Sequence, residues 1–129
     1  MAVNEHHALA KEEAIELLDL EHEPMLTLAL DKSAFPRYLV QCCVKAGFQP
    51  IIFQEASEPQ TLLAMVGAGL GVTLVPETTS RIGWPGVVFV PIRTNPPSAN
   101  LYISYTTLDD APVVRAFLNI INPPSAPVG

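Results

Sequence analysis

Residues 61–76 read TLLAMVGAGLGVTLVP, and this stretch decides which fold the chain can adopt. Apolar residues recur at helical spacing up to Val66, and Gly69 then ends the predicted helix. Residues 72–75 form a short apolar run of strand length that Pro76 stops. The glycines follow a helix and precede a strand, which is the reverse of their order in a dinucleotide-binding turn. We therefore interpret them as helix termination and close packing.

The same alternation of helix and strand extends in both directions from this stretch. The pattern predicts strands at residues 25–30, 51–54, 72–75, 87–90 and 101–105. It predicts helices at residues 11–20, 33–46, 58–68, 77–82 and 111–121. Because the strands are continuous apolar runs, the sequence predicts an α/β fold with a mostly parallel sheet covered by helices on both faces.

Several local features set the expected ends and faces of these helices. Gly47 has the position of a left-handed C-terminal cap. Ser57 and Gln60 have the spacing of a capping box, with the Ser57 hydroxyl accepting from the amide near Gln60. The expected core face of helix 33–46 consists of Phe35, Leu39, Cys42 and Ala46. The last helix is expected to turn a second set toward a core, namely Val113, Val114, Phe117, Leu118 and Ile121.

Composition restricts the classes of function. The chain has 129 residues, 13 acidic and 7 basic side chains, and a net charge of −6. Phosphate contacts need clustered Lys and Arg, so we expect no direct contact with nucleic acid. The polar, acidic N-terminus does not resemble a signal peptide, and no apolar run is long enough for a membrane span. We expect no membrane association and a cytoplasmic location.

The cysteines and histidines are the candidate reactive or metal-binding residues. Cys42 and Cys43 are adjacent, and such pairs rarely reach disulfide geometry without strain. We expect one to pack in the core, and a redox role is not favoured because Lys45 is their one basic neighbour. His6 and His7 lack metal-ligand spacing with carboxylate support, so we expect them to decorate the surface. The sequence predicts no metal site and no cofactor.

The order of segments resembles one known family. The resemblance begins with HALA at residues 7–10 and LLDL at 17–20, and continues with CC at 42–43 and AGFQP at 46–50. It is strongest over residues 61–76 and ends with VVRAFL at 113–118. This series resembles the effector-binding domain of LysR-type transcriptional regulators. The resemblance implies a periplasmic-binding-protein-like fold of two α/β lobes with the effector in the cleft between them.

The resemblance also implies that this sequence carries only part of the domain. Residues 1–121 correspond to a partial effector-binding domain. Lobe two occupies about residues 23–92, and residues 93–121 form the segment that returns toward lobe one. Residues 122–129 are expected to be a flexible Pro-rich tail. The family's winged helix-turn-helix and most of its first lobe have no counterpart here. The closing strand and helix are expected to fold onto lobe two, swap with a second chain or pair in a dimer.

Three loops are the candidate ligand contacts. Ligands of open α/β sheets bind beyond the carboxyl ends of the strands, and helix N-termini there favour anions. In this family the loops matching 57–59 and 75–76 border the effector cleft. The alternative reading is that these residues only cap a helix, form a solvated turn or stop a strand. The candidate ligand-binding residues are Lys32, Ser33, Phe35, Ser57, Glu58, Pro59, Val75 and Pro76.

The favoured function is sensing of a small organic effector, with a carboxylate as the expected class, by a regulator domain that forms a homodimer. We do not expect an enzyme, because the sequence has no nucleophile elbow, P-loop or paired acid and base. One alternative is an interaction module that dimerises through helix 33–46 and binds no ligand. Another is a fragment of a solute-binding protein, against which the polar N-terminus argues.

Overall fold

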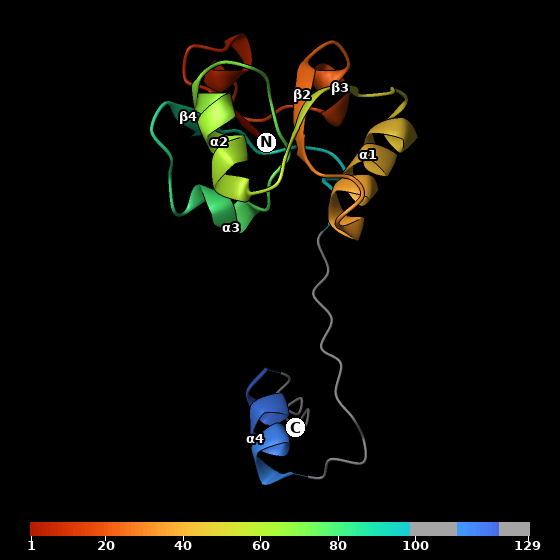
Figure 1. Ribbon diagram of the computed structural model, residues 1–129, viewed down its shortest axis with the longest axis vertical. Coiled ribbons are helices and arrows are strands. Elements are labelled where there is room, and N and C mark those ends of the chain that lie inside the picture. Colours follow the sequence, from red (N-terminus) through yellow and green to blue (C-terminus); the bar gives the residue numbers. More distant parts are fainter. Residues whose placement is uncertain (99–110, 122–129) are drawn as a thin grey trace, which may run out of the picture. The chain divides into compact units, whose positions relative to one another are not determined.

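The computed structural model describes residues 1–98 and 111–121, which belong to two compact units (Figure 1). The first unit contains, in chain order, β1 (Ala2–Asn4), the 3-10 helices η1 (Ala8–Lys11) and η2 (Leu17–Leu20), β2 (Pro24–Leu28), α1 (Ala34–Ala46), β3 (Ile51–Ala56), α2 (Pro59–Gly67), α3 (Glu77–Ser80) and β4 (Val87–Phe89). The second unit contributes α4 (Pro112–Ile121).

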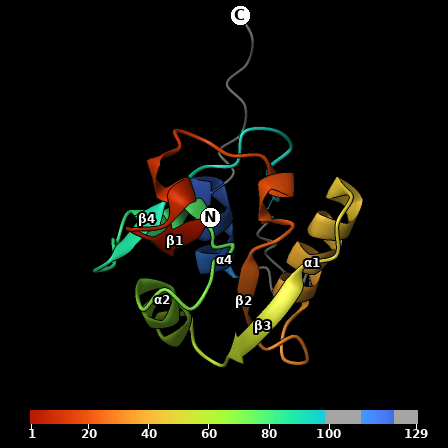
Figure 2. The same ribbon diagram turned by 90° about the horizontal axis from the view of Figure 1, so that it is seen from above.

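Two small sheets are joined by one short segment. Strands β2 and β3 pair in parallel, and β1 pairs with β4 antiparallel. Val72 and Thr73 lie between β2 of the first pair and β1 of the second. On the side of β2, the Val72 amide donates to the Pro24 carbonyl (2.9 Å), and the Leu26 amide donates to the Val72 carbonyl (2.8 Å). On the other side, Thr73 and Ala2 exchange two backbone hydrogen bonds of 2.8 and 3.1 Å. The resulting order is β4, β1, residues 72–73, β2 and β3 (Figure 2).

The two faces of this sheet bury different clusters. Alternate strand residues point to opposite faces, so Val3 and Met25 pack in one cluster while Ala2 and Leu26 pack in the other. The first cluster includes Leu39 and Cys43 of α1, and the second includes Leu62, Leu63 and Val66 of α2. Helices α1 and α2 therefore cover opposite faces, and Figure 1 shows them on either side of β2. The expected two-sided α/β layering is present.

Gly71 is the residue that lets the joining segment approach β2. A Cβ atom built on Gly71 would lie 2.3 Å from the Pro24 carbonyl oxygen and 3.2 Å from Leu26 Cγ. The same Pro24 carbonyl accepts the hydrogen bond from Val72. A side chain at position 71 would have to displace backbone that the sheet junction uses. Only glycine fits this approach.

The helix ends follow the expected glycine chemistry. Gly69 has φ +78°, and the amides of Gly69 and Leu70 donate to the carbonyls of Val66 and Met65. This is the Schellman pattern, which satisfies carbonyls left open at the end of α2. Gly47, with φ +108°, ends α1 in the same way. The prediction that these glycines end helices is confirmed.

Two features at the front of the chain differ from the prediction. Strand β1 was not predicted, although Ala2 and Val3 are fully buried. The helix predicted at residues 11–20 is wrong: η1 and η2 are two separate 3-10 turns. An Asp19 carboxylate accepts from the Glu16 amide at 2.8 Å and fixes the second turn. A three-residue strand has too little pattern to be recognised, and scattered apolar residues suit 3-10 turns as well as a helix.

Two finer predictions also differ from the structure. The capping box is wrong, because Glu58 is the N-cap of α2 and Pro59 takes the first helical position. Proline is favoured there because it has no amide to satisfy. The predicted core face of α1 is confirmed for Leu39, which is buried, and for Phe35 and Cys42, which are partly buried and pack against the core, but not for Ala46, which is exposed. Pro36 and Cys43 are buried as well, and they were not predicted to face the core.

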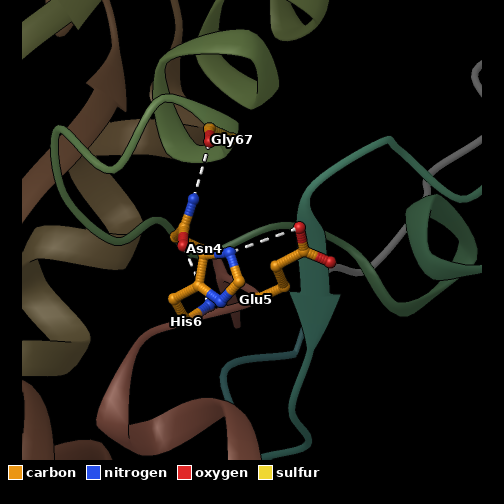
Figure 3. A network of polar contacts seen from close by, with 4 residues as sticks. All are labelled: Asn4, Glu5, His6 and Gly67. Carbon is orange, nitrogen blue, oxygen red and sulfur yellow. Dashed lines mark hydrogen bonds and ion pairs between the residues drawn. The ribbon is translucent and has the colours of Figure 1, made fainter.

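Asn4 ties β1 to the end of α2. Its side-chain amide donates to the Gly67 carbonyl at 2.6 Å, and its Oδ1 accepts from the His6 amide at 2.9 Å (Figure 3). His6 lies beside Glu5 on the exposed side of this network. His7 is not surface decoration: its Nδ1 accepts from the Leu9 amide and its Nε2 lies 3.2 Å from a Glu23 carboxylate oxygen. The front of the chain is thus held by side chains as well as by β1.

The second unit is represented by α4. Its predicted position at residues 111–121 is confirmed. The expected turn of its apolar face toward a core stays a prediction, because α4 belongs to a unit of its own. The strand predicted at 101–105 and the tail at 122–129 lie outside the described residues.

The close approach at Gly71 predicts that Gly71→Ala destabilises the fold strongly. We expect the free energy of unfolding to fall by about 3 kcal/mol, the upper end of the range for overpacking. The measurement is urea unfolding followed by the fluorescence of Trp84, the chain's single tryptophan. Gly47→Ala is the matched control: its Cβ meets nothing within 4 Å, and only its positive φ costs, about 1 kcal/mol. Equal stability of the Gly71→Ala and parent chains would contradict this account.

Candidate functional site

The candidate site lies beyond the carboxyl ends of the parallel strands. Strand β2 ends at Leu28, and the joining segment leaves the sheet through Leu74 and Val75. Helices α1 and α2 both begin at this edge, since each follows directly on a strand of the parallel pair. This is the edge at which open α/β sheets bind ligands.

A cavity of about 240 Å³ occupies this position. Its walls come from the first turns of α1 and α2, the end of β2, residues 74–76 and α3. The lining residues are Leu28, Phe35, Pro36, Leu39, Pro59, Leu62, Leu63, Leu74, Val75, Pro76 and Thr79. Among these described residues, Thr79 alone has a polar side chain. The cavity is an apolar pocket between two helices, at the edge of a sheet.

Four of the eight predicted ligand-binding residues line this cavity. They are Phe35 from α1, Pro59 from α2, and Val75 and Pro76 from the segment after the sheet junction. The structure thus brings together residues from all three predicted loops. Ligand contact by these residues stays a prediction.

The other four predicted residues lie at the same edge without lining the cavity. Ser33 is the N-cap of α1, and its hydroxyl accepts from the Phe35 amide at 3.2 Å. Lys32 is exposed in the turn before it, where its amide donates to the Ala29 carbonyl. Ser57 and Glu58 are exposed, and the Glu58 side chain makes no capping hydrogen bond. Their predicted ligand contact is likewise untested.

The turn that carries Lys32 is held by charged side chains. A Glu55 carboxylate oxygen accepts from the Leu30 amide at 3.1 Å, and Arg37 donates to the Leu30 carbonyl at 2.5 Å. The Ala29 amide donates to the Ala56 carbonyl at the end of β3. These contacts fix the entry into α1 and with it the position of Phe35 at the cavity wall.

Sequence reasoning missed seven of the lining residues. Leu39 was expected to face the core, and a core face next to an open strand edge becomes a cavity wall where packing is incomplete. Leu28 and Leu74 lie at the strand ends already marked as a ligand edge, so position alone could have indicated them. Thr79 had no signal in the sequence. The missed residues are Leu28, Pro36, Leu39, Leu62, Leu63, Leu74 and Thr79.

None of the described residues that line the cavity has a titratable side chain. Burial raises the pKa of Cys43 to about 11, with the neighbouring Cys42 as a smaller cause. Burial lowers the pKa of the Met1 amino group, which donates to the Val90 carbonyl, to about 6. Within residues 1–98 and 111–121, no group of three or more His, Cys, Asp or Glu could hold a metal ion. No helix in these ranges is long and apolar enough to cross a membrane.

The family comparison decides the relationship of the chain. The LysR substrate binding domain model matches residues 1–123, nearly the whole length. This chain belongs to the LysR substrate-binding-domain family. The resemblance seen in the sequence is therefore confirmed, including its extent from the front of the chain through α4. The family is one of transcriptional regulators.

LysR-type relatives with established names align over most of this chain. The transcriptional regulator XapR of Escherichia coli (strain K12) is 35% identical over 118 residues, which is 92% of this chain and 40% of XapR. The regulator AlsR of Bacillus subtilis (strain 168) is 33% identical over 125 residues, 95% of this chain and 41% of AlsR. The chain thus spans about two fifths of the length of these relatives.

Solved LysR structures share the fold. The BenM effector binding domain with its effector benzoate superposes with a TM-score of 0.68 at 28% identity, over 74% of this chain and 45% of that domain. The C-terminal domain of a probable LysR family regulator from Rhodococcus sp. RHA1 superposes with a TM-score of 0.66 at 25% identity, over 93% of this chain and 60% of that domain. The predicted periplasmic-binding-protein-like fold, present in part, is confirmed.

The two cysteines should differ sharply in reactivity. Cys43 is fully buried and its raised pKa leaves little thiolate at pH 8, whereas Cys42 is partly exposed. We expect a thiol reagent such as Ellman's reagent to modify one cysteine per native chain and two per denatured chain. In the Cys42→Ser variant, the reagent should modify no cysteine in the native chain and one cysteine in the denatured chain. Rapid modification of native Cys42→Ser would show that α1 does not bury Cys43 as described.

Proposed function

We propose that this chain senses a small organic effector for a LysR-type transcriptional regulator, and that the cavity between α1 and α2 contributes to the effector site. The observation that carries this proposal is the cavity's position at the carboxyl edge of the parallel strands, between the starts of two helices. Family membership supports it, because the BenM domain with the same fold is described with benzoate as its effector.

The proposed role is regulatory and not catalytic. The lining contributes ten apolar side chains and one hydroxyl, which do not form a general acid and base pair. The net charge of −6 supports an indirect action on DNA through the rest of the regulator. We place the protein in the cytoplasm, where a transcriptional regulator meets its DNA.

A second candidate function, dimerisation, is favoured by exposed apolar side chains. Strand β3 lies at the end of the strand order, and Ile51 and Phe53 on it are 53% and 59% exposed. Val44 on α1 is also half exposed. Apolar groups left open on an edge strand and a neighbouring helix suit a surface that pairs with a second copy. We propose that the regulator is a homodimer and that these exposed apolar side chains take part.

A thermal-shift screen tests effector binding, with a panel that includes small carboxylates and uncharged compounds. A ligand at roughly five times its Kd stabilises by about 1 kcal/mol, which raises Tm by roughly 3–5 °C for a chain of this size. Val75→Phe should abolish the shift, because the larger side chain at this lining position would occupy part of the cavity. Ile82→Phe adds a ring at a residue that is 84% exposed and does not line the cavity, and this variant should keep the shift.

The outcomes separate the two candidate functions. A ligand-dependent rise that Val75→Phe removes supports effector binding at the cavity. A rise that survives Val75→Phe shows that the effector binds elsewhere on the chain. No rise across the panel, together with a concentration-dependent dimer in sedimentation, favours the dimerisation module and rejects sensing by this chain.

A further inference from the structure

The lining of the cavity is graded from a buried floor to an exposed rim. Four leucines that are largely inaccessible to solvent form the floor, namely Leu39, Leu62, Leu63 and Leu74. Pro59 and Pro76 are exposed and form the rim. A ligand in this cavity therefore meets hydrocarbon at depth and solvent at the two prolines.

The side chains of the floor offer no partner for a charge. A carboxylate moved from water into an apolar site without a partner loses far more free energy than burial of a ring returns. The hydroxyl of Thr79 is the one polar side-chain group among the described lining residues. Lys32 and Ser33, which led to the expectation of a carboxylate, do not line the cavity. The interior thus selects against ionised groups.

The charges beside the rim also disfavour an anionic ligand. Pro59 is preceded by Glu58, and Pro76 is followed by Glu77, and both glutamates are exposed. A carboxylate that stayed in solvent at the rim would lie on the part of the surface that these two acids flank. The opposing effect is modest because water screens exposed charges. It nevertheless acts against anions and not against neutral polar groups.

The volume limits the size of the occupant. An engineered cavity of about 150 Å³, lined by similar aliphatic and aromatic side chains, stays dry and binds benzene. The present cavity, at about 240 Å³, has room for one six-membered ring and a short substituent. Most sites for larger ligands exceed roughly 300 Å³.

From these observations we infer that the cavity binds an uncharged compound with a single apolar ring, oriented with its ring on the leucine floor and its polar substituent at Pro59 and Pro76. This inference rests on the proposed function and specifies its ligand class. It replaces the carboxylate expected from the sequence with a neutral compound of the same size.

Benzyl alcohol and benzoate make a direct test, because they share the ring and differ in charge. Binding to the full chain is followed by NMR of ¹³C-labelled leucine and valine methyls. We expect benzyl alcohol to shift the methyls of Leu39, Leu62 and Val75 and to bind at least about tenfold more tightly than benzoate. Val75→Phe should remove this binding, and Ile82→Phe, at an exposed residue that does not line the cavity, should leave it unchanged.

The rim is tested by Glu58→Gln combined with Glu77→Gln. Benzoate should then bind about two- to fivefold more tightly, which is the range expected for two exposed charges. Benzyl alcohol should change less than twofold. An unchanged benzoate affinity would remove the rim from the argument and contradict that half of the inference.

Each remaining result has a distinct meaning. If benzoate binds as tightly as benzyl alcohol, and Val75→Phe weakens both, the cavity is an effector site but the inferred ligand class is wrong. If neither compound shifts the lining methyls while another panel compound does so, the size and ring requirement is wrong. If no compound of the panel shifts them, the proposed function and the inference both fail.

Discussion

The backbone pairing of Val72 and Thr73 is the interaction on which the rest of this structure depends. These two residues accept and donate hydrogen bonds to β2 on one side and to β1 on the other. Without them, the chain has two separate two-stranded sheets, and isolated pairs of strands are marginally stable in water. The junction exists because Gly71 lets the backbone pass within hydrogen-bonding distance of the Pro24 carbonyl.

The same junction determines where the cavity lies. After Thr73 the chain continues through Leu74, Val75 and Pro76, all of which line the cavity. Leu28, at the end of β2, completes the strand side of the wall. The residues that hold the two sheets together therefore also position one wall of the candidate ligand site. A change in the register of the junction would move that wall relative to α1 and α2.

The sequence predicted local structure correctly where a residue type has one dominant effect on the backbone, as glycine has at the end of a helix. The roles of Gly47 and Gly69 at helix ends followed from backbone chemistry alone. The strand predicted at 72–75 is reduced to two isolated bridges at Val72 and Thr73. Strand β1 escaped because three residues carry no usable period, and its burial depends on β4, more than eighty residues later. The Ser57 capping box failed because Pro59 suits the first helical position, which places the cap at Glu58.

The candidate site divides along the same line. Its place at the strand edge could be predicted from the order of elements, and Phe35, Pro59, Val75 and Pro76 were named on that basis. Its chemistry could not, because sequence order does not reveal that Lys32 and Ser33 lie outside the lining while buried leucines form the floor. That distinction depends on how two helices pack across a sheet.

Native-state hydrogen exchange tests the central role of the junction most directly. The amides of Ala2, Leu26 and Val72 make its hydrogen bonds, and they should exchange only through global unfolding. Their exchange free energies should equal the free energy of unfolding from urea titration and should exceed those of amides in α3. Exchange of the Val72 and Leu26 amides through a local opening, at lower free energy than β4, would contradict the view that this junction holds the fold together.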